Sequence, residues 1–282
     1  MAKPNRHSRK HAKHRPSGQP VQKPHPEPDN VAPMGRYDAP GDEPLAIASR
    51  LTLQEAFRID RALVKRLKRR GVNTKEAFTI RDESGAWFRA AFQECDADGG
   101  LALPYERMDR SPEPSIDVTL ACAVLARQRM HFVMQKATEL GVMRIIPLLT
   151  DHSVPAEGLE HEQAHAWPDH VARAAKQCRR GSLPAVLPPM PLDSLLVSHV
   201  FTAADLGLFL DDRSEAAPHP TGPPRRIVLL IGPEGGFSDA ERAKLASKAR
   251  PWRLGGRVLR AETAVVVGLT AIHMRWGDFT GG

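Results

Sequence analysis

Two glycine-containing segments near the C-terminal end of the sequence have the composition of ligand-binding loops. The first is I231-G-P-E-G-G-F-S-D-A-E241, which directly follows the apolar run R226-I-V-L-L-I231, and the second is L254-G-G-R-V-L-R-A-E-T-A264. Glycine lets the backbone approach a bound molecule closely, because it has no Cβ atom that would collide with it. Both segments are therefore candidates for a ligand site, although the first alone also fits an ordinary strand-to-helix turn.

The spacing of the glycines matches neither of two common phosphate-binding patterns. A dinucleotide-binding turn has the pattern G-x-G-x-x-G with an acidic residue about 20 positions later, and a P-loop has G-x-x-x-x-G-K-[ST]. The stretch G232-P-E-G-G-F-S238 has neither spacing, and no lysine follows its glycines. The pattern therefore disfavours phosphate as the ligand.

Alternating strands and helices are predicted around these segments. Short apolar runs predict the strands, and apolar stripes with helical spacing predict the helices between them. The predicted strands are 116–125, 144–149, 206–210 and 226–231, and the predicted helices are 128–140, 163–180, 238–249 and 261–276. This alternation predicts an α/β fold with a mostly parallel sheet covered on both faces. Both glycine segments would then follow strands, at the sheet edge where open α/β sheets bind ligands.

The region before the α/β part has a different pattern. Residues 45–68 are mixed helical and basic, and Gly71 is a plausible helix stop. The following short apolar or aromatic runs are separated by turn residues, which predicts a small antiparallel sheet with hairpins. The predicted parts are a tail over 1–44, a small β-rich domain over 45–110 and an α/β domain over 115–282.

The N-terminal tail carries most of the net charge. Residues 1–28 contain seven lysines and arginines against the single Glu27, whereas the whole chain has a formal net charge of +7. With almost no apolar residue, this segment cannot bury enough surface to offset the entropy of ordering, so we expect disorder to about Pro44. Two interpretations stay open, a solvated extension or an arm that attracts RNA through counterion release.

Composition also argues against several classes of protein. There is no run of 18 apolar residues and no apolar core of a secretory signal, so we expect a cytoplasmic protein without membrane contact. Cys95, Cys122 and Cys178 lie far apart without a Cys-x-x-Cys pair, so we expect neither a metal site nor a disulfide framework.

Five ordered motifs resemble the ribosomal RNA small-subunit methyltransferase E family of the SPOUT class. The motifs are Q135-K-A-T-E-L-G-V142, I146-P-L148, K176-Q-C-R-R180, I231-G-P-E-G-G-F-S238 and L254-G-G-R-V-L-R-A-E-T-A264. Members of this family methylate N3 of one uridine of 16S rRNA. The resemblance implies a deep trefoil knot in the α/β domain, an exception to the usual absence of knots. It also implies that the first domain is a small PUA-like β-barrel that binds RNA.

The resemblance implies S-adenosylmethionine as the methyl donor, bent into the knot between three loops. Those loops would be the end of L208-F-L-D-D212, the turn 232–236 and the segment 254–259. The residues expected to contact the donor are Leu210, Gly232, Pro233, Glu234, Gly235, Gly236, Leu254, Gly255, Leu259, Arg260, Thr263 and Ala264.

Arg260 and Glu234 are the candidate catalytic residues. Uracil N3 becomes nucleophilic only as its proton leaves, so negative charge developing on the uracil oxygens must be stabilised, and Arg260 is the candidate for this role. Pairing of Arg260 with Glu262 or Glu234 is the alternative. Glu234 is a candidate proton acceptor, or it orients the glycine turn by accepting hydrogen bonds from backbone N–H groups. No firm general base is assigned.

The expected partners are 16S rRNA in the small ribosomal subunit and a second copy of the chain. Four cations in the matched motifs are candidate RNA contacts, with a solvated helix face as the alternative for each: Arg129, Lys136, Arg179 and Arg180. The helix over 261–276 is apolar on nearly every side, which fits a core or the interface of a homodimer.

The sequence departs from the family pattern mainly on the expected RNA side. Ala126, His152, Lys176 and Ser182 stand where the family has other, mostly charged, residues. Three alternatives therefore stay open: a SPOUT methyltransferase with a different RNA base as its target, a non-catalytic RNA- or ribosome-binding relative, and an unrelated α/β nucleotide enzyme. The missing phosphate motif disfavours the last of these.

Overall fold

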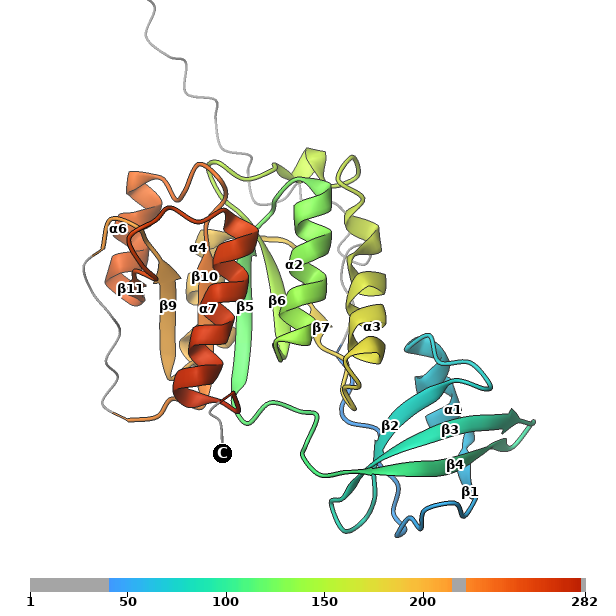
Figure 1. Ribbon diagram of the computed structural model, residues 1–282. Coiled ribbons are helices and arrows are strands. Elements are labelled where there is room, and N and C mark those ends of the chain that lie inside the picture. The colour runs from blue at the N-terminus through green and yellow to red at the C-terminus, as the bar shows by residue number, and fades with distance from the viewer. Residues whose placement is uncertain (1–40, 215–221, 280–282) are drawn as a thin grey trace, which may run out of the picture. The chain divides into compact units, whose positions relative to one another are not determined.

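The computed structural model describes residues 41–214 and 222–279, which form two β-sheets and the helices packed on them (Figure 1). Residues 1–40 of the predicted tail lie outside the described residues. The larger sheet follows an α/β pattern with parallel strands, which confirms the predicted fold class at that level.

The larger sheet has seven strands, and every neighbouring pair in it is parallel. Its order is β11-β9-β10-β5-β6-β7, and β8 also pairs with β6. Three of the predicted strands are reproduced to the residue, because each is a buried apolar run bounded by polar or turn residues. The bounds are β5 (Asp117–Ala123), β6 (Arg144–Leu149), β7 (Ala185–Val186), β8 (Met190–Pro191), β9 (Leu206–Leu210), β10 (Arg226–Ile231) and β11 (Arg250–Trp252).

Side chains of this sheet alternate between two hydrophobic clusters, one on each face. In β10, Leu229 and Ile231 belong to the cluster shared with α2, α3 and α7, whereas Val228 and Leu230 belong to the cluster shared with α4 and α6. Figure 1 shows α2, α3 and α7 side by side over the near face of the sheet. The helices are α2 (Arg127–Glu139), α3 (Trp167–Gln177), α4 (Leu192–Val197), α5 (His199–Thr202), α6 (Asp239–Lys248) and α7 (Ala261–Trp276), with short 3₁₀ turns η1 (Ala156–Gly158) and η2 (Ala164–Ala166).

Local signals fix the ends of several helices. Ser238 caps α6 by accepting a hydrogen bond from the backbone N–H of Glu241, and the Glu241 carboxylate accepts one from the backbone N–H of Ser238. This reciprocal pair is the predicted capping box. Gly141 follows the end of α2 with a left-handed φ of +86°, a conformation that favours glycine.

The smaller sheet is antiparallel, with the order β1-β4-β3-β2 and α1 packed on it. Leu67 of α1 is buried with Ile80 and Phe92 of the sheet. The bounds are β1 (Phe57–Asp60), α1 (Arg61–Arg69), β2 (Ala77–Arg81), β3 (Trp87–Cys95) and β4 (Gly99–Met108).

The helix expected in the first part of this region begins later than the sequence suggested. Residues Phe57–Asp60 pair with β4 instead, and Asp60 then caps α1 by accepting a hydrogen bond from the backbone N–H of Leu63 at 2.7 Å. Ordered contacts also begin before Leu45, because Asp42 pairs with the backbone of Leu183 and with Arg70.

Candidate active site

A cavity of about 390 Å³ lies at the carboxyl ends of β9, β10 and β11. Three segments line it: the residues after β9 from Leu210 to Arg213, the turn 232–237 after β10, and much of the segment 252–261 before and into α7. Because the three strands are parallel neighbours, the segments that follow them meet at one edge of the sheet. The two glycine segments singled out in the sequence therefore face the same cavity.

The structure gathers the predicted cofactor-binding residues around this cavity, with one exception. All of them line it apart from Thr263, which is exposed on α7 and does not contribute to the wall. The lining residues from that prediction are Leu210, Gly232, Pro233, Glu234, Gly235, Gly236, Leu254, Gly255, Leu259, Arg260 and Ala264.

Two of the lining glycines have backbone conformations that L-residues rarely adopt. Gly236 has a φ of +71° and closes the turn by donating a hydrogen bond to the carbonyl of Pro233 at 2.9 Å, and Gly255 has a φ of +154°. A Cβ atom at either position would meet no neighbouring atom within 4 Å, so it is the backbone conformation that requires glycine there. The wall at these points is main chain that a ligand can approach directly.

The turn 232–236 is supported from the loop that follows β6. The ring of His152 lies against Gly235, and His152 Nδ1 is 3.0 Å from the carbonyl oxygen of Gly236. Asp151 accepts a hydrogen bond from the Ser238 hydroxyl, and its backbone N–H donates to Glu241 at 3.0 Å. Sequence reasoning noted His152 only as a departure from the family, because no local spacing signals a contact across more than 80 residues.

Asp211 and Arg242 form a second polar group in the cavity wall. The end of the stretch 208–212 was expected to contact the donor, but neither of these two residues was among the predicted contacts. The Asp211 carboxylate is buried, pairs with Arg242 and accepts a hydrogen bond from the backbone N–H of Arg213 at 3.0 Å. Both side chains line the cavity. The acidic pair D211-D212 after an apolar strand was the available signal for a polar site at this point.

Arg260 and Glu234 differ in their partners although both line the cavity. Arg260 is the N-cap residue of α7, its side chain is exposed, and no acidic partner for it appears within residues 41–214 and 222–279. The expected alternative, a pair with Glu234 or Glu262, is not what the structure contains. Glu234 instead pairs with Arg129 of α2, whose Nε also lies 4.0 Å from Glu262.

Cys122 lies buried near the end of β5, where the negative charges of Glu234 and Glu262 act on its thiol. Burial is the main cause that raises the pKa of its thiol, and the charges of Glu234 and Glu262 raise it further. The thiol therefore stays protonated, which makes Cys122 a poor nucleophile.

The four cations predicted to contact RNA do not come together. Arg129 bridges to Glu234 at the cavity, Lys136 pairs with Glu139 at 2.8 Å on the same helix, and Arg179 pairs with Glu106 of β4 at 3.2 Å. Each of these three is partly exposed, so its role toward RNA stays a prediction.

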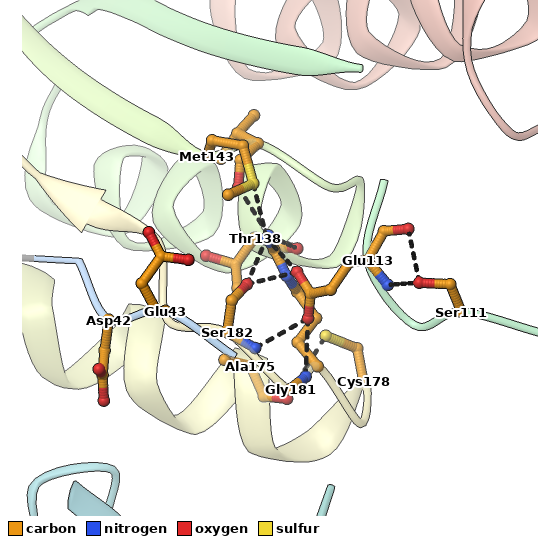
Figure 2. A network of polar contacts seen from close by, with 12 residues as sticks. Asp42, Glu43, Ser111, Glu113, Thr138, Met143, Ala175, Cys178, Gly181 and Ser182 are labelled. Carbon is orange, nitrogen blue, oxygen red and sulfur yellow. Dashed lines mark hydrogen bonds and ion pairs between the residues drawn. The ribbon is translucent and has the colours of Figure 1, made fainter. Parts of the chain in front are cut away.

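Arg180 is a correction to that prediction. Its side chain is only 3% exposed, pairs with Glu113 at 3.0 Å and donates to the carbonyl of Val142 at 2.6 Å. Figure 2 shows Glu113 beside Gly181 and Ser182, whose backbone N–H groups donate to its carboxylate at 2.7 and 2.8 Å. A guanidinium that is buried and used in this way is closed to RNA. It ties the segment before β5 to the ends of α2 and α3.

The described residues contain neither a membrane-spanning helix nor a cluster of metal-ligating side chains. No helix in 41–214 and 222–279 has the length and apolarity needed to cross a bilayer. Across the same ranges, no group of three or more histidine, cysteine, aspartate or glutamate side chains is arranged to hold a metal ion.

Comparisons with known proteins identify the family of the chain. The family described as the RNA methyltransferase domain matches residues 111–273. The ribosomal RNA small subunit methyltransferase E of Synechocystis is 31% identical over 206 residues, which cover 70% of this chain and 66% of the relative. The protein of the same name from Mesomycoplasma hyopneumoniae is 30% identical, with 58% of this chain and 73% of the relative covered.

A solved structure extends the likeness to most of the fold. The ribosomal RNA small subunit methyltransferase E of Neisseria gonorrhoeae, bound to S-adenosyl methionine, has a TM-score of 0.58 at 26% identity. The match covers 84% of this chain and 99% of that protein. The family model matches more than half of the sequence, and the two glycine segments among the motifs line one cavity, so this chain belongs to the ribosomal RNA small subunit methyltransferase E family of RNA methyltransferases.

Proposed function

We propose that this protein is an S-adenosylmethionine-dependent rRNA methyltransferase that methylates N3 of a uridine in 16S rRNA of the small ribosomal subunit. The observation that carries the proposal is the cavity at the carboxyl ends of β9, β10 and β11, where both glycine segments supply exposed main chain. Family membership and the donor-bound relative from Neisseria gonorrhoeae support the same assignment.

The cavity fits a nucleoside-sized donor by its volume and by its wall. About 390 Å³ lies within the range of roughly 300–1,000 Å³ usual for small-molecule sites. The backbone at Gly236 and Gly255 has no side chain to keep an adenosyl group away. When bound, S-adenosylmethionine supplies a sulfonium methyl group for in-line transfer to a nucleophile.

The residues of this chain have three tasks in that reaction. The turn 232–236 and the segment 254–260 hold the donor, since they form two walls of the cavity. Arg260 stabilises negative charge on the uracil oxygens as the N3 proton leaves, because its exposed guanidinium has no acidic partner in the described part of the chain. Glu234 is the acceptor for that proton, and Arg129 holds its carboxylate at the cavity wall.

The knot and the first domain complete the proposed architecture. Family membership, with the resemblance described above, supports a deep trefoil knot in the domain over 115–282. In the sheet of that domain, β10 lies between β5 and β9, although it is far from β5 in sequence. The antiparallel sheet with α1 supports a PUA-like RNA-binding domain over 45–110.

A homodimer in the cytoplasm, where ribosomal subunits are present, belongs to the same proposal. Exposed apolar side chains on α2 and α7 support such an interface, because Phe132 is 40% exposed and Met274 is 61% exposed. Size-exclusion chromatography with light scattering tests this point. A species of 31 kDa, the mass of one chain, would contradict the dimer.

The second candidate function is methylation of a different RNA base. It is favoured because two cations on the expected RNA side are used in contacts within the protein. Arg180 is buried, and Lys176 pairs with Glu76 at 2.7 Å. Incubation of unmodified small ribosomal subunits with the protein and donor, followed by mass-spectrometric mapping, separates the candidates. One N3-methyluridine in 16S rRNA supports the proposal, a methyl group on another base supports the second candidate, and donor binding without any methyl transfer contradicts both.

A further inference from the structure

Helix α1 has two basic faces that are used differently. Arg66, Arg69 and Arg70 all pair with the single carboxylate of Asp42, at N–O distances of 2.8 to 2.9 Å. Arg70 is buried and also donates to the carbonyl of Glu43. This face therefore stabilises the fold, and its charges are partly neutralised within the protein.

The other face carries cations without such partners. Arg61, Lys65 and Lys68 are spaced i, i+4 and i+7, so they lie along one side of the helix. All three side chains are exposed, and in the described parts of the chain none of them has an acidic partner. Nothing in the packing of α1 requires three uncompensated charges on this side.

These three cations border a hollow between α1 and the turn that joins β3 to β4. Val64 of the helix and Gly99 at the start of β4 contribute to its wall, together with Asp96. Asp96 does not neutralise the helix cations, because its carboxylate pairs with Arg58 at 2.8 Å and accepts from the backbone N–H of Gly99. The hollow is consequently electropositive on its α1 side.

We infer that this hollow binds the phosphate backbone of rRNA through Arg61, Lys65 and Lys68. From Arg61 to Lys68 the helix rises by about 10 Å, so three cations along that length face successive phosphates of one strand. Guanidinium and ammonium groups bind phosphate oxygens through charge-assisted hydrogen bonds. This inference rests on the proposed function, since it places part of the RNA substrate on α1.

The test compares the full-length wild type with three full-length variants in RNA binding and donor binding. The first variant, Arg61→Gln/Lys65→Gln/Lys68→Gln, removes the free cations. The second, Arg50→Gln/Arg226→Gln/Lys244→Gln, removes three exposed cations that pair with acidic residues elsewhere, at 3.5, 3.4 and 2.7 Å. Both variants have the same net charge, and both keep the seven lysines and arginines of residues 1–28, so the tail contributes equally.

Fluorescence anisotropy with a 16S rRNA fragment at several salt concentrations gives the affinity and its salt dependence. For the first variant we expect at least a tenfold weaker affinity at low salt. The slope of log K against log salt should be smaller by about 2, from roughly 0.7 per lost phosphate contact. Donor affinity measured by calorimetry and the melting temperature should stay unchanged, because the three side chains are exposed. Lys65→Arg/Lys68→Arg should keep the wild-type slope.

The outcomes separate this inference from the proposed function. If the wild type methylates small subunits and the first variant keeps its affinity and slope, the hollow is not an RNA contact. Equal weakening in both triple variants assigns the effect to net charge and also overturns the inference. A wild type that binds the donor but neither binds nor methylates rRNA overturns the proposed function together with the inference.

Discussion

Arg260 and Arg180 come from motifs of the same family resemblance, yet they lie in opposite surroundings. Arg260 is exposed at the wall of the cavity, with no acidic partner in the described residues. Arg180 is buried and shared between Glu113, Ser182 and two backbone carbonyls. Family motifs thus contain residues of two kinds. Those available to a ligand are exposed and have no acidic partner, whereas those that stabilise the fold are buried and paired.

The largest expected effect is a loss of protein stability when the buried Arg180 is removed. Arg180→Ala removes a buried guanidinium from Glu113, whose side chain is 13% exposed, and breaking a buried pair costs about 3–5 kcal/mol. We expect a loss of that order in the free energy of unfolding measured with urea. Lys136→Ala removes one partner of a half-buried pair on α2 and should cost no more than about 1 kcal/mol. Equal losses of unfolding free energy in the two variants would contradict the view that Arg180 holds the fold together and Lys136 does not.

Removal of the exposed Arg260 is expected to affect turnover rather than stability. Arg260→Ala should lower turnover on small ribosomal subunits by about 10²–10³-fold, the usual cost of removing one stabiliser of transition-state charge. Donor affinity and melting temperature should change little, because the side chain is exposed and has no acidic partner among residues 41–214 and 222–279. Turnover equal to that of the wild type would remove Arg260 from the mechanism.

Substitution of Gly236 in the cavity wall is expected to have an intermediate effect, on donor binding. Gly236→Ala places a Cβ atom on a residue with φ of +71°, which costs about 1–2 kcal/mol in the left-handed region. We expect weaker donor binding by roughly tenfold in calorimetry, since 1.4 kcal/mol corresponds to that factor. Gly256→Ala is the matched control, because Gly256 does not line the cavity, has open space around it and has no left-handed φ. A similar loss in the control would show that the turn has no special role.

The smallest expected effect concerns pH and the helices α2 and α3. The rings of His131 and His170 are stacked, with centroids 4.1 Å apart, and burial lowers the pKa of both below the ordinary histidine value of 6.5. Nearby charges of Arg127 and Arg173 lower the pKa of His131 further, while Glu162 raises it.

Because the unfolded chain binds these protons more readily, stability should fall as the pH decreases below about 6.5. Urea unfolding of the wild type and of His170→Gln at several pH values measures this. The variant should show a flatter pH dependence, and a dependence as steep as that of the wild type would assign the titration to other groups, such as His273.

The sequence predicted the part of the fold that depends on local patterns. The strand 226–231 and the helix 261–276 have the predicted bounds, since each is an apolar segment bounded by polar residues or turns. The two glycine segments also pointed to the cavity, because their glycines form a local pattern in the sequence. β1 escaped prediction, since its four residues are held by pairing with β4 rather than by a periodic pattern.

Contacts between distant residues could not be read from the sequence. Arg180 is buried because Glu113, 67 residues earlier, comes to lie beside it. Arg129 pairs with Glu234 across 105 residues, and its Nε also lies 4.0 Å from Glu262, the acidic residue two positions after Arg260. Such pairings are set by the tertiary fold, and residue type and spacing carry no signal for them.

A crystal structure of the protein with S-adenosylmethionine tests the central claim most directly. We predict that the adenosyl group lies between the turn 232–236 and the segment 254–260 and forms hydrogen bonds with main-chain N–H and C=O groups there. A donor bound elsewhere, or a cavity without the donor at saturating concentration, would contradict the assignment.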